Sequence, residues 1–224
     1  MCFRKTIKVK IEQQRDWRYE IKYVLTPDQW FQIEQLLSVH PAGFSEAFPD
    51  RIVNNIYYDT PDFSTCRDNL AGISQRKKYR LRWYGSENKI INPIFEIKIK
   101  NNALGRKDFL ILEDYTKIGE INSRINNKLI GLSGIGPVLQ NQYIRSYYIN
   151  FEGDFRLTVD RKIKYQKSND QKMLNGDFPF HDDRIILELK FKAQDIKKQH
   201  EITKYIPFRN SKNSKYVTGI FYCY

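Results

Sequence analysis

The sequence predicts an α+β fold in which about eight antiparallel strands close into a barrel, or tunnel, with a basic lumen and helices packed on the outside. Three observations lead to this expectation. Five segments alternate charged and apolar residues, the formal net charge is +12 over 224 residues, and the apolar faces of those segments are bulky enough to require a second layer. An open sheet with a solvated charged face explains any one such strand. Five together favour closure, which turns the charged faces inward.

The five alternating segments cover residues 18–23, 78–84, 95–100, 156–160 and 187–192. In the second of them, Lys78, Arg80 and Arg82 share one face, while Tyr79 and Trp83 lie on the other. Alternate side chains of a strand point to opposite sides of the sheet, so this pattern aligns the three cations. In an empty lumen the Lys and Arg side chains of these strands would repel one another. We therefore expect the lumen to hold anions, water or both.

The first helix is predicted to begin at Thr26, with Pro27 in its first turn and Gln29 completing a capping box. Apolar residues at helical spacing follow, starting with Trp30, which we assign to the core, and continuing to Leu37. Such a helix would cover the outside of the barrel.

The remaining elements follow from turn residues and apolar periodicity. In chain order, we expect a strand over 52–58, a turn over 59–62, a short helix over 63–69 and a helix over 114–132, which is ended by Gly131, Gly134, Gly136 and Pro137. An antiparallel pair of strands over 143–151 and 155–165 follows. Beyond it we expect a loop over 168–183, a polar helix over 193–205 and a short helix that begins at Ser214. The sequence shows neither an internal repeat nor a linker, so we expect a single domain over residues 1–224.

The composition excludes several classes of protein. A hydrophobic fraction of 41% and an aromatic fraction of 14% argue against disorder. The longest apolar stretches are far shorter than the roughly 20 residues of a membrane helix, and the N-terminus resembles no secretory signal, so we expect a cytoplasmic protein. The cysteines and histidines are too scattered for a disulfide framework, a zinc site or histidine chemistry: Cys2, Cys66, Cys223, His40, His181 and His200.

A charge of +12 suits nucleic acid, an anionic membrane surface or a phosphate-rich substrate. Its placement on alternating strands, rather than in long basic blocks, favours the third. Arginine forks and lysine point charges together suit a polyphosphate chain. Carboxylates on the same strand faces would either pair with these cations or hold a divalent metal that bridges phosphates: Glu20, Glu96, Asp160 and Glu188.

Six segments together resemble the successive motifs of the VTC (vacuolar transporter chaperone) polyphosphate polymerase domain, a family of triphosphate tunnel metalloenzymes. They occur in the family's order and span nearly the whole chain: RYEIKY at 18–23, NIYYDTPDF at 55–63, RLRWYG at 80–85, FEIK at 95–98, LELK at 187–190 and NSKY at 213–216. The family's fold is a closed antiparallel barrel with a basic lumen.

The resemblance implies transfer of the γ-phosphate of ATP to inorganic polyphosphate, with release of ADP and with Mn²⁺ or Mg²⁺ as cofactor. By motif, the catalytic residues would be Lys22, Arg80, Arg82, Lys98, Arg145 and Arg156. Substrate would also contact Lys107, Tyr143, Lys190, Ser214 and Lys215. Glu188 would bind the metal, and Glu20 and Glu96 are further metal candidates. A terminal phosphate oxygen is already ionised near neutral pH, so this reaction requires no general base.

Two other functions remain open. The first is that of the hydrolases of the same superfamily, which are identified by an ExExK pattern on the first strand. This chain has Arg18-x-Glu20-x-Lys22 there, and the replacement of a carboxylate by a cation favours the polymerase. A non-catalytic polyphosphate or inositol-phosphate sensor is the second. Nucleic acid is the least favoured ligand, because a duplex cannot enter so narrow a barrel. In fungal relatives the catalytic domain is fused to membrane segments, and by that comparison we expect a separate membrane subunit that holds the chain at the inner face of a membrane.

Overall fold

The computed structural model describes residues 11–13, 16–86, 89–112, 117–128, 134–168 and 178–224. Its strands are β1 (Ile11–Gln13), β2 (Arg18–Leu25), β3 (Ser45–Asp59), β4 (Gln75–Tyr84), β5 (Ile94–Asn101), β6 (Leu104–Ile111), β7 (Gly136–Ile149), β8 (Phe155–Lys167), β9 (Phe180–Asp182) and β10 (Ile185–Lys192). Its helices are α1 (Trp30–Val39), α2 (Ser64–Leu70), α3 (Ile118–Lys128), α4 (Gln199–Thr203) and α5 (Lys215–Cys223), and the 3₁₀ turns are Pro27–Gln29 and Ala193–Lys198.

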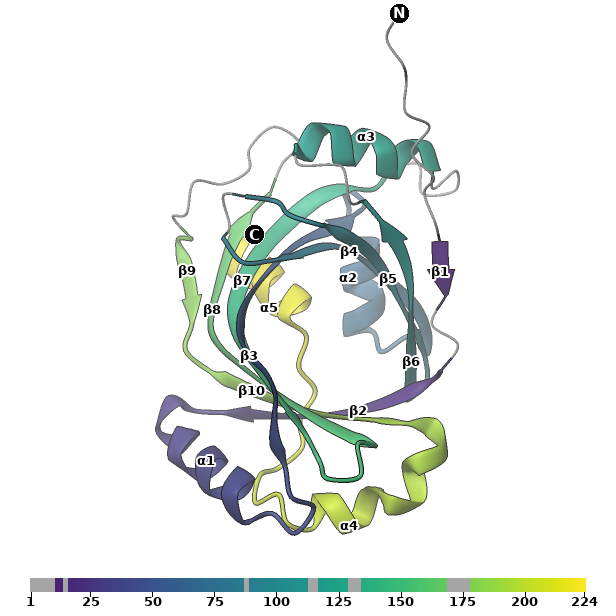
Figure 1. Cartoon of the computed structure of the whole chain (residues 1–224). Coiled ribbons are helices and arrows are strands. Elements are labelled where there is room, and N and C mark those ends of the chain that lie inside the picture. The colour runs from purple at the N-terminus through teal and green to yellow at the C-terminus, as the bar shows by residue number, and fades with distance from the viewer. Residues whose placement is uncertain (1–10, 14–15, 87–88, 113–116, 129–133, 169–177) are drawn as a thin grey trace, which may run out of the picture.

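Eight of these strands close a ring in the order β6-β2-β10-β8-β7-β3-β4-β5, and β5 pairs back to β6 (Figure 1). The ring pairings are antiparallel, with β1 added beside β6 and β9 beside β8. Cross-strand partners share a face, so Arg82, opposite Asn55, and Glu188, opposite Lys22, point to one side of the wall. The prediction of a closed antiparallel tunnel with its charged faces inward is confirmed.

Several predicted boundaries need correction. Strand β6 was not predicted, because Gly105 and the charged run 106–108 interrupt the alternation that marks the other strands. Gly136 and Pro137 open β7 rather than ending the preceding helix. Part of the predicted loop, residues 180–182, forms β9, and the predicted polar helix is a 3₁₀ turn followed by the short α4. Positions 114–116, 129–132 and 169–177 of the predicted helix and loop lie outside the described residues.

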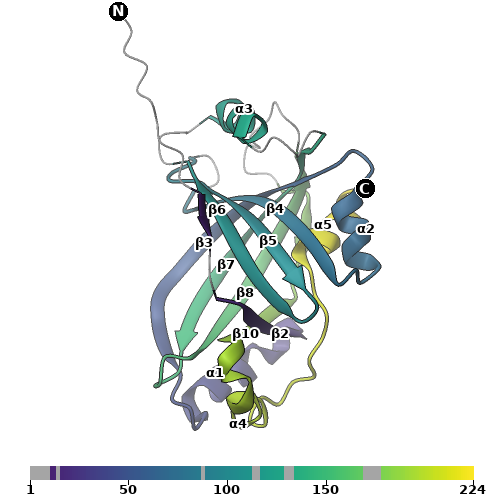
Figure 2. The same ribbon diagram turned by 90° about the vertical axis from the view of Figure 1, so that its right-hand side faces the viewer.

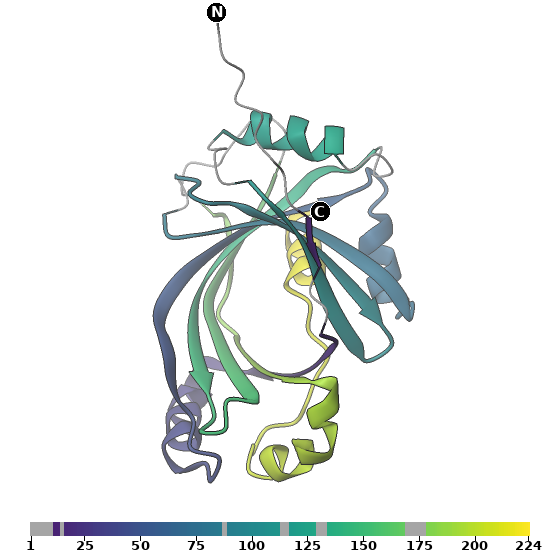
Figure 3. The ribbon, with the colours of Figure 1, turned by 45° about the vertical axis from the view of Figure 1, so that its right-hand side comes forward.

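Helices cover the outward faces of the ring in two places. One core packs Ile33 and Leu36 of α1 and Ile202 of α4 against outward residues such as Leu187 and Leu189 of β10. The other packs α3 against β4 and β5, with Ile121 beside Leu81 and Trp83 in one cluster. Figures 2 and 3 show α3 at one end of the view and α1 with α4 at the other. Trp30 is half-buried at the rim of the first core, where its indole nitrogen donates to Glu34 (2.8 Å), so it is a boundary residue rather than a central one.

Helix α5 lies inside the ring. Its residues Tyr216, Ile220 and Cys223 pack against inward-facing side chains of β3, β7, β8 and β10, including Leu139, Tyr165 and Ile186. The Tyr216 hydroxyl donates to Asp59, whose carboxylate also accepts from the backbone nitrogens of Thr65 and Cys66 at the start of α2. Helix α5 therefore fills one end of the ring with apolar side chains, and α2 lies beside it there (Figure 2).

Among the described residues, no helix has the length and apolar character needed to cross a membrane.

Candidate functional site

The interior beyond α5 is a cavity of about 630 Å³. Its lining includes fourteen Lys and Arg side chains against six Asp and Glu. All the site residues expected from the sequence line it: Glu20, Lys22, Arg80, Arg82, Glu96, Lys98, Lys107, Tyr143, Arg145, Arg156, Glu188, Lys190, Ser214 and Lys215. The fold thus brings residues predicted from strand alternation and from the family motifs, over the whole length of the chain, into one space.

The wall formed by β4, β5 and β6 carries a three-residue ion cluster. Arg80 donates from Nε to a Glu96 carboxylate oxygen (2.7 Å), and the Lys107 ammonium lies 3.2 Å from the other oxygen. Burial opposes the charge of Glu96, but Arg80 and Lys107 outweigh it and hold the pKa of that carboxyl well below its usual range. Burial, with Arg80 nearby, lowers the pKa of Lys107 to about 7. Lys107 is therefore a cation whose charge depends on what lies beside it.

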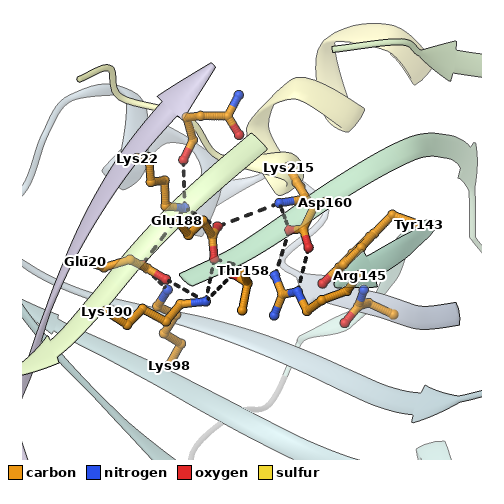
Figure 4. A network of polar contacts seen from close by, with 12 residues as sticks. Glu20, Lys22, Lys98, Tyr143, Arg145, Thr158, Asp160, Glu188, Lys190 and Lys215 are labelled. Carbon is orange, nitrogen blue, oxygen red and sulfur yellow. Dashed lines mark hydrogen bonds and ion pairs between the residues drawn. The ribbon is translucent and has the colours of Figure 1, made fainter. Parts of the chain in front are cut away.

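The facing wall is centred on Glu188 (Figure 4). Its carboxylate lies 2.6 Å from the Lys190 ammonium and 3.1 Å from that of Lys22. Arg145 and Lys215 lie 3.5 and 3.7 Å away. Burial opposes its charge, but these cations hold the pKa of Glu188 well below its usual range. The Glu188 carboxylate therefore orients the four cationic side chains around it.

Glu20 lies beside Glu188 on the same wall. It accepts from Lys98 (2.7 Å), and Lys22 and Lys190 are each 3.9 Å away. Lys22 and Lys190 therefore bridge Glu20 and Glu188. Burial and the charge of Glu188 act to raise the pKa of Glu20, but Lys98, Lys22 and Lys190 outweigh both and hold that pKa well below its usual range.

Asp160 faces the interior from β8, between Arg145 and Lys215, and is fully buried. Arg145 binds it with two parallel bonds (2.5 and 2.6 Å), and the Lys215 ammonium lies 2.5 Å from it. Bidentate Arg–carboxylate pairs fix the plane of the guanidinium. Asp160 thus positions Arg145 without lining the cavity itself. The sequence placed it on the polar face of its strand, but only the fold shows which cations it holds.

Arg82 is held by neutral partners. Its Nε donates to Asn55 Oδ1 and a terminal nitrogen donates to the Tyr143 hydroxyl, both at 2.8 Å. The Tyr143 ring also faces the charges of Arg145 and Lys215, at 5.2 and 5.0 Å from its centroid. Among the described residues Arg82 forms no ion pair with a carboxylate, so it has no such pair to break when it contacts a ligand.

The N-terminus of α5 opens into the cavity. Ser214 caps the helix by accepting from the Val217 nitrogen (3.3 Å), and it also accepts from the Lys78 ammonium (2.9 Å). Lys22 donates to the Asn213 carbonyl (3.1 Å). Burial, together with the charges of Lys98 and Lys22, holds the pKa of Lys78 well below its usual range. Backbone N–H groups and converging lysines make this position suitable for an anion.

The cavity also contains cations that were not assigned to the site from the sequence: Arg18, Lys78, Lys100, Arg106 and Lys192. Four of them lie on the same strand faces as residues that were assigned to the site, so strand alternation alone predicts that they line the cavity. Arg106 belongs to β6, the strand that the alternation did not reveal. Its guanidinium stacks on Trp17 at 5.3 Å.

The carboxylates fit a metal site that a phosphate completes. The described residues contain no group of three or more His, Cys, Asp and Glu side chains that could hold an ion by themselves. Mg²⁺ is usually held by one or two carboxylates together with substrate phosphates. Glu188 and Glu20 share one wall and meet that requirement, whereas Glu96 lies on the other wall in its own cluster with Arg80 and Lys107. Of the three candidate carboxylates, Glu188 and Glu20 together therefore fit a divalent metal site better than Glu96 does.

A ring of eight antiparallel strands around a cationic cavity is the fold of the triphosphate tunnel proteins. A protein from Vibrio parahaemolyticus named as an adenylate cyclase matches with a TM-score of 0.54 and 14% identity, over 91% of this chain and 97% of that one. A Hippeastrum protein named as an adenylyl cyclase, with a dominant triphosphatase activity, matches with a TM-score of 0.54 and 15% identity, over 93% and 97%. A Pyrococcus horikoshii protein matches with a TM-score of 0.52 and 15% identity, over 92% and 98%.

Within this class, the VTC domain family matches residues 17–224, and the chain belongs to that family. The resemblance expected from the sequence motifs is confirmed. No curated protein matches the sequence. Proteins of the triphosphate tunnel superfamily are phosphate-handling enzymes that typically use divalent metals.

Proposed function

We propose that this VTC domain is a polyphosphate polymerase that transfers the γ-phosphate of ATP to a growing inorganic polyphosphate chain and releases ADP. The observation that carries the proposal is the cavity lining, in which fourteen cationic side chains from both walls face one space against six acidic ones. A phosphate chain presents negative charge at every residue, so it matches an extended cationic lining better than a single anion does.

The cations would act by alignment and charge neutralisation, which are the main requirements of phosphoryl transfer. A terminal oxygen of the acceptor chain attacks the γ-phosphorus, the bond from that phosphorus to the β–γ bridging oxygen breaks, and ADP leaves with the electron pair. Arg80 and Arg82 on one wall and Arg145 on the other, which all line the cavity, would neutralise the equatorial oxygens. Lys22, Lys98, Lys107, Lys190 and Arg156 would hold the flanking phosphates, with Tyr143, Ser214 and Lys215 completing the contacts.

Glu188 with Glu20 would hold the divalent metal, Mn²⁺ or Mg²⁺. When bound, such an ion neutralises phosphate charge and orients the reacting oxygens. On binding of phosphate, Lys22 and Lys190 would turn from the two carboxylates towards the phosphate oxygens. The ion pairs of the cavity thus hold the cations in an ordered arrangement before substrate binds, and the phosphates would then replace the carboxylates as their partners.

Arg18 supports a polymerase over a hydrolase. It lines the cavity at the first position of the Arg18-x-Glu20-x-Lys22 pattern, where its guanidinium is close enough to Arg156 for that charge to lower the pKa of Arg18, burial being the larger cause. A carboxylate at this position would add a metal ligand. A cation adds affinity for phosphate instead, which favours retention of a chain.

The test is incubation of the purified chain with ATP and Mn²⁺, with separate assays for long-chain polyphosphate, ADP and free phosphate. The proposal predicts polymer and ADP in matching amounts, with little free phosphate. Free phosphate without polymer would identify a triphosphate tunnel hydrolase and contradict the proposal. Binding without any ADP would instead identify a sensor of polyphosphate or inositol phosphates.

We further propose that the domain works at the cytoplasmic face of a membrane with a separate membrane subunit, by comparison with fungal relatives. Membranes from cells that express the chain should then synthesise polyphosphate faster, per mole of chain, than the purified chain. Equal rates would contradict this part of the proposal.

A further inference from the structure

The mouth of the cavity away from α5 carries an aromatic cluster around Arg51. The Arg51 guanidinium lies over the rings of Phe48, Tyr84 and Tyr147, at 4.9, 5.7 and 5.7 Å from their centroids. Phe48 and Tyr147 also meet edge to face at 5.9 Å. We call these four residues the aromatic rim. Three rings and a guanidinium plane in one place form a surface for a flat aromatic ligand.

The aromatic rim is open to solvent and continuous with the cationic cavity. Phe48 is 50% exposed and Tyr84 39% exposed, and Arg51 is exposed as well. Tyr84 and Tyr147 line the cavity. In the part of the chain that the structure describes, Arg51 has no ion pair, so its donors are free for a ligand.

Strand register places the rim next to the arginines of the site. Arg51 is the cross-strand partner of Arg145, so the two residues share a face. Tyr84 follows Arg82 by two residues on β4, and Tyr147 follows Arg145 by two on β7, a step of about 7 Å along each strand. Burial raises the pKa of Tyr147 to about 12, and the charges of Arg145 and Arg82 act on it in the opposite direction.

These positions suit the two ends of a nucleotide. Along β4 and β7, one direction from Arg80, Arg82 and Arg145 leads towards α5 and the other leads towards the rim. The α5 end is filled by buried side chains such as Tyr216 and Ile220. The rim is open, and one ribose can span the distance from a phosphate at Arg82 to a ring beside Tyr84.

We propose that the aromatic rim binds the base of the nucleoside triphosphate, with the base stacked on Tyr84 and Tyr147 and the Arg51 guanidinium contacting it. This inference rests on the proposed function, because it assumes a triphosphate in the cationic cavity. It adds that the chain distinguishes a nucleotide from an inorganic phosphate chain by contacts outside the cation cluster.

The test compares binding of ATP with binding of inorganic tripolyphosphate, which has the phosphates but no base. Calorimetric titrations would use the wild-type chain, Tyr84→Ala, Tyr84→Phe and, at the most exposed ring, Phe48→Ala. Stacking on one ring affects affinity by about tenfold, so Tyr84→Ala should weaken ATP by about that factor and leave tripolyphosphate unchanged. Tyr84→Phe keeps the ring and should bind ATP as the wild type does. Phe31→Ala removes a 63% exposed ring from α1 and is the matched control for loss of a surface aromatic.

Two results would overturn the inference while leaving the proposed function in place. The first is unchanged ATP affinity in both Tyr84→Ala and Phe48→Ala. The second is an equal loss for ATP and tripolyphosphate, which would mean that the rim supports the phosphate site rather than a base. A wild-type chain that binds neither ligand would overturn the proposed function itself, and the inference with it.

Discussion

The interior of the tunnel has two regions, a charged one and an apolar one, built from the same strands. On β7 the inward face carries Leu139 in the apolar region and Arg145 in the charged region. On β10 the change falls between Ile186 and Glu188, two successive inward positions. A phosphate chain gains ionic contacts only in the charged region, so the boundary limits how far it can enter.

Helix α5 stands on this boundary and belongs to both regions. Its first residue, Lys215, pairs with Asp160 at 2.5 Å, while Ile220 and Cys223 pack in the apolar cluster. The charged region therefore depends on its ion network for function, whereas the apolar region depends on close packing to keep α5 in place. Substitutions should separate the two.

The largest effect is expected at Arg80 in the charged region. Arg80→Ala should abolish ATP turnover and leave the fold intact, because Glu96 keeps Lys107 as a partner. Arg80→Lys retains a charge but loses the arginine fork, and we expect a loss of about 100-fold or more in kcat. Turnover assays with thermal melting curves check both variants. Arg67→Ala on α2, which removes an exposed ion pair with Asp62, is the control. Near-normal turnover in Arg80→Ala would remove β4 from the site.

The next effect is on metal dependence. Glu188→Gln should raise the Mn²⁺ concentration for half-maximal activity by about 10- to 100-fold, the range seen when a group supporting a metal site is lost. It should also strengthen metal-free binding of tripolyphosphate, because the amide no longer competes for Lys22 and Lys190. Glu96→Gln on the other wall is the comparison and should leave the Mn²⁺ titration unchanged. An unchanged titration in Glu188→Gln would make Glu188 a structural ion-pair residue.

In the apolar region, Gly219→Ala tests the packing of α5. A Cβ at this position would meet Leu139 Cδ2 and Tyr165 Cδ1, each at 2.5 Å. Overpacking of this kind costs about 1–3 kcal/mol in the free energy of unfolding. Gly119→Ala in α3, where an added Cβ meets nothing within 4 Å, is the matched control. Urea unfolding measures both, and equal stabilities would mean that α5 is loosely packed.

The last effect concerns pH. Burial lowers the pKa of Lys107 to about 7 and the pKa values of Lys100 and Lys190 to about 8, in each case with help from neighbouring cations. A bound phosphate chain favours the protonated lysines, so binding requires proton uptake above these pKa values. Tripolyphosphate affinity should therefore fall from pH 7.5 to 9, by about tenfold for each of these lysines that takes up a proton on binding. Titration calorimetry measures it, and Lys107→Arg, which stays charged, should flatten the profile. An affinity that rises over this range would contradict the assignment.

Local periodicity predicted most of the charged region. Lys22, Arg80, Lys98 and Glu188 lie where strand alternation placed them, because alternation depends on nearest neighbours in sequence. The apolar region was not predicted. Ser214 was recognised as a helix cap, yet nothing local shows that α5 enters the ring and packs on Leu139, about 80 residues earlier.

Pairings across the tunnel were equally out of reach from the sequence. The alternatives for the carboxylates, ion pair or metal, could be stated but not assigned, because the partners of Glu188 come from β2, β7 and α5 as well as β10. The aromatic rim joins residues of β3, β4 and β7 that share no motif. Such sites arise from register and closure, which a periodic pattern does not encode.

The central claim is that the charged region, and not the apolar one, binds the phosphate chain. The most direct test is calorimetric titration of tripolyphosphate, with Mn²⁺ present, into the wild-type chain, Arg80→Lys and Gly219→Ala. We predict saturable binding at one site per wild-type chain, binding at least about tenfold weaker in Arg80→Lys, and affinity close to wild type in the folded fraction of Gly219→Ala. Equal affinity of the wild-type chain and Arg80→Lys, or no saturable binding at all, would contradict the account.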